Sequence, residues 1–159
     1  MTGSTHPAAP GTGGGRLVLV GTPIGNLGDL APRAVEALAG ADLVCCEDTR
    51  RTGRLLQHAG VRATALRVTN EHTEASVVDE VLDRLGRGER VAVVSDAGMP
   101  GISDPGERLV AAAAAAGHVV EVVPGPSASL AALVASGLPA GRFCFEGFLP
   151  RKPGERARA

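Results

Sequence analysis

Short runs of apolar residues, many of them β-branched, recur along the chain with segments of helical length between them. Five runs are nearly all apolar, namely residues 17–20, 43–46, 63–68, 91–94 and 119–123. Such runs are typical of parallel strands that helices cover on both faces. Because strands and helices alternate, the pattern predicts an α/β domain with a mainly parallel five-stranded sheet, helices on both faces and right-handed crossovers.

Helical periodicity fills the segments between these runs. Apolar side chains repeat at a spacing of about 3.6 residues in segments 30–38, 77–85, 109–116 and 128–136. Gly86, Gly117 and Gly137 follow the last three segments, and glycine is the preferred residue just after a helix. We therefore expect each of these helices to end at its glycine.

The length of 159 residues fits one domain with one core, which we place at residues 16–149. Residues 1–15 are rich in Gly, Pro and Thr and lack the apolar stretch of a signal peptide, so we expect a disordered leader. Residues 150–159 are charged and break the pattern, which suggests a linker to a second domain that the chain lacks. No apolar run is long enough to predict a membrane span.

Composition limits how the chain could bind nucleic acid. The net charge is −1, and the chain has three Phe, no Trp and no Tyr. It therefore has neither a global positive field nor the aromatic platforms on which single-stranded bases stack. Any RNA contact is expected at local basic groups, which are Arg50, Arg51, Arg54 and residues 151–158.

The chain has three cysteines, Cys45, Cys46 and Cys144. They are too few for a disulfide framework, and no Cys-x-x-Cys pair suggests zinc, so we expect no metal site. Reduced thiols in the core are the expected state.

The most informative loop is residues 95–106, which follows an apolar strand and contains three Gly, two Pro and two Asp. Glycine permits close backbone approach, proline fixes the shape of the loop, and aspartate accepts hydrogen bonds from hydroxyls or amines. In α/β proteins ligands bind at this end of a strand. Part of the loop has a structural interpretation, in which Asp104 caps the next helix and Pro105 opens it.

Four other strand ends carry similar loops, and each has two interpretations. Residues 21–29 form a plain Gly/Pro turn or one wall of a nucleoside pocket, because their glycine spacing fits neither a dinucleotide fingerprint nor a P-loop. In the structural interpretation, residues 47–53 supply a helix cap and a solvent-exposed helix face. In the functional interpretation, they supply a pair of carboxylates and an arginine that binds a phosphate. Residues 70–74 form an exposed capping box or hold a base. Residues 124–128 open a helix whose free N–H groups could receive a polar ligand edge.

Taken together, the motifs strongly resemble the ribosomal RNA small subunit methyltransferase I family of the tetrapyrrole methylase superfamily, the class III S-adenosylmethionine-dependent methyltransferases. The motifs occupy residues 21–27, 47–53, 95–100, 124–128 and 142–150. The Glu-Asp-Thr-Arg and Gly-Phe-Leu-Pro segments separate this family from its porphyrin-methylating relatives. This chain departs from the family at Thr73, where the family usually has Asn, and in lacking the family's second domain.

The resemblance implies a cytoplasmic homodimer that uses S-adenosylmethionine to methylate the 2′-oxygen of a cytidine ribose in small-subunit (16S) ribosomal RNA within the 30S subunit. It implies two α/β domains per subunit, with the donor folded into the cleft between them. It also implies that the donor site is lined by Thr22, Pro23, Gly25, Asn26, Asp96, Ala97, Gly98, Met99, Ile102, Ser103, Ser127 and Ala128.

Methyl transfer from a sulfonium chiefly requires alignment of the reacting atoms and exclusion of water. A ribose hydroxyl is a poor nucleophile, so a nearby carboxylate or imidazole would help by accepting its proton. The candidates are Asp48 and Glu47 first, then His72 and Glu74, with Arg50 holding the adjacent phosphate. Two alternatives stay open: a small-molecule methyltransferase of the same superfamily, and a non-catalytic module for adenosine binding or dimerisation left by truncation.

Overall fold

The computed structural model describes residues 14–63, 65–69 and 73–158. Its five strands form one sheet in the order β3-β2-β4-β1-β5, and every pairing between them is parallel. The strands are β1 (Arg16–Val20), β2 (Leu43–Cys46), β3 (Leu66–Val68), β4 (Arg90–Val93) and β5 (Val119–Val123). The predicted α/β class with a parallel sheet is confirmed, although β3 is only half as long as the apolar run that predicted it.

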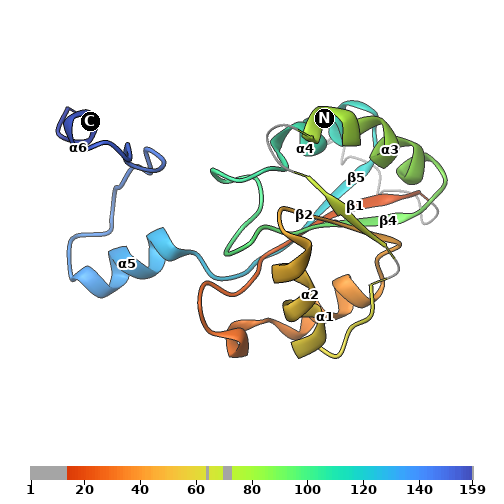
Figure 1. Cartoon of the computed structure of the whole chain (residues 1–159), viewed down its shortest axis with the longest axis horizontal. Coiled ribbons are helices and arrows are strands. Elements are labelled where there is room, and N and C mark those ends of the chain that lie inside the picture. The colour runs from red at the N-terminus through yellow and green to blue at the C-terminus, as the bar shows by residue number, and fades with distance from the viewer. Residues whose placement is uncertain (1–13, 64, 70–72, 159) are drawn as a thin grey trace, which may run out of the picture.

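Helices cover the two faces of the sheet in separate layers (Figure 1). One layer contains α1 (Pro32–Ala39) and α2 (Thr49–His58), and the other contains α3 (Glu74–Gly86) and α4 (Glu107–Ala115). Successive side chains of a strand point to opposite faces, and β1 follows this rule: Val18 and Val20 pack with α1 and α2, whereas Leu17 packs with α3 and α4. The prediction of helices on both faces is confirmed.

The strand β3 departs from the expectation that every strand is covered on both faces. Leu66 and Val68 are 38% and 39% exposed. The reason is position, because β3 lies at the edge of the sheet and β2 is its only neighbouring strand among the described residues.

The chain beyond β5 leaves the sheet and forms what we call the C-terminal arm, residues 127–158. The arm contains α5 (Ala128–Ser136) and α6 (Pro153–Arg156), and both project away from the sheet (Figure 1). The predicted helix and its end at Gly137 are confirmed by the left-handed φ of 69° there, but α5 buries no residue. The arm exposes seven large apolar side chains, which are Leu130, Val134, Leu138, Phe143, Phe145, Phe148 and Leu149.

Two of the three cysteines match the expected core thiols. Cys45 and Cys46 are buried in β2, where burial raises the pKa of Cys45 to about 11 and so keeps its thiol protonated and unreactive. For Cys144 the expectation is wrong, because this residue is exposed on the C-terminal arm. Within the described part of the chain, no helix combines the length and apolar character that crossing a membrane requires.

Candidate functional site

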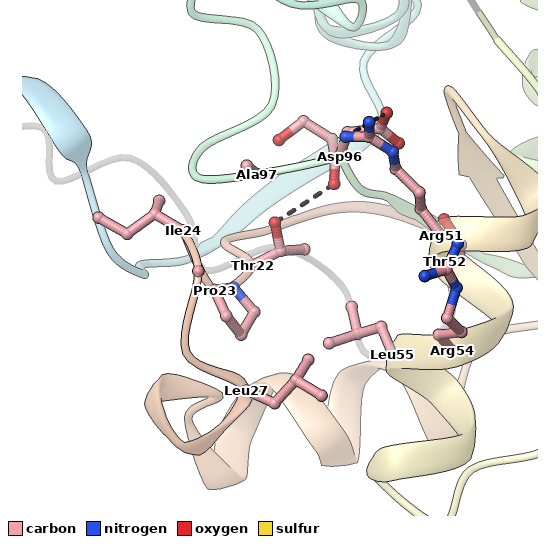
Figure 2. A pocket seen from close by; sticks show the side chains of 12 residues that line it. Thr22, Pro23, Ile24, Leu27, Arg51, Thr52, Arg54, Leu55, Asp96 and Ala97 are labelled. Atoms are coloured by element: carbon pink, nitrogen blue, oxygen red, sulfur yellow. Dashed lines mark hydrogen bonds and ion pairs between the residues drawn. The ribbon is translucent and has the colours of Figure 1, made fainter.

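A cavity of about 500 Å³ opens at the carboxyl ends of the strands, between the loops after β1 and β4 and the helix α2. Its volume is in the range of small-ligand sites. Figure 2 shows side chains from all three segments around it. The lining residues are Thr22, Pro23, Ile24, Gly25, Leu27, Arg51, Thr52, Arg54, Leu55, Ser95, Asp96 and Ala97.

Hydrogen bonds hold the β1 and β4 loops against each other. Thr22 and Gly98 exchange two backbone bonds, with N···O distances of 2.9 and 3.2 Å. The buried Thr22 hydroxyl also donates to the Ser95 carbonyl at 3.2 Å (Figure 2). Gly98 supports this arrangement with a φ of +89°, which L-residues with side chains rarely adopt. The backbone of the two loops that form this wall is therefore held in place by hydrogen bonds of the fold itself.

The β5 loop joins this wall through direct backbone packing at Gly21 and Gly125. A Cβ added at Gly21 would lie 2.5 Å from the Gly125 nitrogen and 2.8 Å from the Met99 sulfur. A side chain at Gly125 would meet the Gly21 backbone at 2.8 Å. These two glycines therefore let three strand-end loops meet at one place.

The structure gathers some of the predicted donor-site residues at the cavity. Those that line it are Thr22, Pro23, Gly25, Asp96 and Ala97. The others are not among the lining residues. Gly98, Met99, Ile102 and Ser103 belong to the β4 loop, and the last two are exposed. Asn26 accepts the Gly28 N–H, Ser127 is the N-cap of α5, and Ala128 is its first residue.

Sequence reasoning did not place the α2 residues Arg51, Thr52, Arg54 and Leu55 at the cavity, although it expected Arg51 and Arg54 to contact RNA. The other lining residues, Ile24, Leu27 and Ser95, lie in loops that it had identified as possible ligand loops. Arg51 and Leu55 are four residues apart in α2, and Arg51 and Arg54 are three apart, so they share one side of the helix. This helical spacing is the feature of the sequence that could have identified them as neighbours on one surface.

Glu47 ties β2 to the β4 loop. Its Oε1 accepts the backbone N–H of Asp96 at 2.9 Å. Burial raises the pKa of Glu47, and the charges of Asp104 and Asp96 raise it further. The Glu47 carboxyl therefore holds the β4 loop through this hydrogen bond, and it is a stronger proton acceptor than an ordinary glutamate.

Asp104 does not cap a helix, contrary to the structural interpretation of its loop. The helix α4 begins at Glu107, and its N-cap position is Gly106 with a φ of 131°. Burial raises the pKa of Asp104, while a hydrogen bond with the Ser95 side chain opposes that effect. Its carboxyl is instead one of the groups around Glu47.

For Asp48 the capping interpretation is confirmed. Asp48 is the N-cap of α2, and its Oδ1 accepts the Arg50 backbone N–H at 2.8 Å. The Arg50 guanidinium donates to both carboxylate oxygens at 3.2 and 3.0 Å. The Arg50 hydrogen bonds lower the pKa of Asp48 to about 2, so Asp48 is a weak proton acceptor.

This pairing predicts a pH effect on stability. Because the folded-state pKa of Asp48 is below its unfolded value, its contribution is present above pH 4 or so and is lost as pH falls towards 2. Asp48→Asn retains a good cap but removes the charge. We expect wild type to lose more Tm than Asp48→Asn between pH 5 and pH 2 or so in thermal melts, with the two converging at the acid end. Parallel Tm curves for the two proteins would contradict this role.

His72 and Glu74 were the other predicted proton acceptors. His72 lies outside the described residues. Glu74 begins α3, and its side chain also lies outside the description.

Arg51, rather than Arg50, forms an ion pair with the carboxylate of Asp96 in the β4 loop. Arg51 Nη1 lies 3.3 Å from Asp96 Oδ2. The other oxygen, Asp96 Oδ1, is buried and has no hydrogen-bond partner. Because Asp96 lines the cavity, its carboxylate is suited to accept a hydrogen bond from a ligand.

The fold and the cavity define an α/β protein with a ligand site at the strand ends, formed by glycine-rich loops. The chain belongs to the tetrapyrrole (corrin/porphyrin) methylase family, whose sequence profile matches residues 16–158. The predicted resemblance within that superfamily is also confirmed. Over 142 residues the chain is 54% identical to the Ribosomal RNA small subunit methyltransferase I of Xylella fastidiosa, and over 138 residues it is 50% identical to the protein of the same name from Escherichia coli O157:H7.

These alignments cover 89% and 87% of this chain but 52% and 49% of the two relatives, so the chain spans about half their length. A solved structure, the uroporphyrin-III-C-methyltransferase of Thermus thermophilus, shares the fold with a TM-score of 0.56 and 24% identity. That match covers 79% of this chain and 54% of the other.

Proposed function

We propose that this chain forms the first domain of an S-adenosylmethionine-dependent methyltransferase that modifies the 2′-oxygen of a cytidine ribose in small-subunit ribosomal RNA. The observation that carries the proposal is 54% identity over 89% of the chain to a protein named Ribosomal RNA small subunit methyltransferase I. The relatives are about twice as long, which supports residues 16–149 as one of two domains and 150–159 as the link between them. A ribosomal RNA substrate makes the cytoplasm the expected location.

The cavity suits the donor. S-adenosylmethionine carries an amine and ribose hydroxyls, and the Asp96 carboxylate, whose side chain is 25% exposed, is an acceptor for such donors at the cavity wall. The backbone groups of the β1 and β4 loops are already fixed by the bonds between Thr22 and Gly98. The resemblance also implies donor-site residues outside the cavity, such as Ser127 and Ala128. We propose that these residues contact the donor from the other side of the cleft in which it binds.

The donor supplies a methyl group already activated on a sulfonium, so the protein has to position the acceptor and receive its proton. Among the described candidates Glu47 is the better acceptor, because burial raises its pKa whereas Arg50 holds that of Asp48 near 2. We therefore propose Glu47 before Asp48 in this role. His72 and Glu74 stay candidates, because the structure does not describe their side chains.

Two measurements test the function. Calorimetric titration with S-adenosylmethionine is expected to show saturable binding, and labelled donor is expected to transfer its methyl group to isolated small ribosomal subunits. Absence of donor binding contradicts the proposal. Binding without transfer favours the non-catalytic adenosine-binding module, and transfer to a small molecule but not to RNA favours the alternative substrate class.

We also propose a homodimer, supported by the apolar side chains of the C-terminal arm. Val134 and Leu138 are 78% and 66% exposed, and patches of this kind mark interaction surfaces. We expect a dimer in sedimentation velocity at micromolar concentration, and a monomer for the double variant Val134→Glu and Leu138→Glu. Arg142→Glu, a charge change at an exposed polar position of the same arm, is the control and should stay dimeric. A monomeric wild type would refute the proposal.

A further inference from the structure

Two arginines of α2 lie on the wall of the cavity. Arg51 and Arg54 are three residues apart, which places them on the same side of the helix. Figure 2 shows both reaching from α2 on one side of the cavity, with Pro23 and Leu27 of the β1 segment on the other. The cavity therefore has a basic side and an apolar side.

The charges on the wall do not cancel. Asp96 is the only acid among the lining residues, and it pairs with Arg51 at 3.3 Å. Arg54 is exposed and makes no hydrogen bond or ion pair within the described chain. Arg50, by contrast, is engaged by Asp48 through three hydrogen bonds and does not line the cavity. Arg54 thus offers its donors to a ligand.

We propose that Arg51 and Arg54 bind phosphodiester groups of the RNA strand that carries the acceptor ribose. A guanidinium matches a phosphate with two parallel hydrogen bonds, so each side chain can hold one phosphate in a fixed orientation. The exposed apolar side chain of Leu27, on the opposite side of the cavity, then faces the nucleoside between them. This inference rests on the proposed function. It assigns to Arg51 and Arg54 the phosphate-binding role that the sequence had predicted for Arg50.

The arrangement also places the RNA strand beside the donor loop. Arg51 contacts Asp96, which lies in the β4 loop that the proposed function assigns to the donor. A phosphate on Arg51 therefore lies next to the methyl source. Because Arg51 also holds Asp96, replacing it disturbs the β4 loop as well, whereas Arg54 has no ion pair with that loop.

The test is the salt dependence of binding to a short single-stranded oligoribonucleotide, measured by fluorescence anisotropy at several KCl concentrations. Each phosphate contact on single-stranded nucleic acid contributes about 0.7 to the slope of log affinity against log salt. We expect Arg54→Ala to lower the slope by about 0.7, and the double variant Arg51→Ala and Arg54→Ala to lower it by about 1.4. Arg54→Lys keeps the charge and should keep most of the slope.

Arg50→Ala is the matched control, because Arg50 belongs to the same helix but is bound to Asp48, and its slope should equal that of wild type. An equal loss in Arg50→Ala and Arg54→Ala, or no RNA binding by wild type, would overturn the inference. Inorganic phosphate competing as well as RNA at equal phosphate concentration would also overturn it, since the site would then hold a free anion.

Calorimetry with S-adenosylmethionine separates this result from the proposed function. If the chain binds no donor but the slopes change as expected, the proposed function fails while the phosphate site stands.

Discussion

Gly21→Ala is expected to destabilise the fold by about 3 kcal/mol, at the upper end of the cost of forcing extra atoms into a packed site. The added Cβ would lie 2.5 Å from the Gly125 nitrogen and 2.6 Å from its Cα. Both are backbone atoms, so relief requires the ends of β1 and β5 to move apart rather than a side chain to rotate. Urea denaturation followed by circular dichroism measures the change in the free energy of unfolding.

The same substitution at Gly53 is the matched control. Gly53 lies inside α2, and a Cβ there would meet no atom within 4 Å. Alanine in a helix interior is more stable than glycine by about 0.5–1 kcal/mol, so Gly53→Ala should stabilise the protein. Opposite signs at the two glycines identify close packing as the cause, whereas a Gly21→Ala protein as stable as wild type would show that the strand ends are not in contact.

Gly98→Val is expected to weaken S-adenosylmethionine binding at least tenfold, which corresponds to about 1.4 kcal/mol. Gly98 has a φ of +89° and exchanges two backbone hydrogen bonds with Thr22. A β-branched residue is strained at that φ, so the loop would shift away from the geometry that holds Asp96 and Ala97 at the cavity. Gly98 is buried, so some loss of stability should accompany the loss of binding.

Gly117→Val separates these two effects. Gly117 has a φ of +78°, and a Cβ there would meet no atom within 4 Å. It follows α4, and it does not line the cavity. The valine should therefore cause a similar strain and a similar fall in Tm, while calorimetric titration shows unchanged donor affinity. If both variants lost donor affinity equally, the effect would be one of stability and not of the loop.

Alternation of apolar runs and helical segments predicted the architecture because both signals are local. A buried parallel strand is apolar over most of its length, as β1 and β4 are after the arginine that begins each of them, and this is visible in any short window of sequence. The run that predicted β3 exceeded the strand because the sequence does not record which strand lies at the edge. The helix α5 was likewise recognised from its own residues, but its departure from the sheet depends on what packs against it.

The candidate site was predictable only in part, for a related reason. Glycine and proline identified the β1 and β4 loops, since these residues restrict or release the backbone locally. The tie between Glu47 and Asp96 joins positions 49 residues apart, and no local pattern records it. The choice among Arg50, Arg51 and Arg54 depends on which of them the cap residue Asp48 engages, and that is settled by side-chain geometry.

The exposed strand β3 has a consequence for the solubility of the protein. A sheet edge presents unpaired N–H and C=O groups, which are a template for pairing with another chain and hence for aggregation. The centre of β3 is Arg67, whose guanidinium lies 2.8 Å from the Glu80 carboxylate of α3. A charge in the middle of a three-residue strand makes that edge short and polar, which disfavours the addition of a foreign strand.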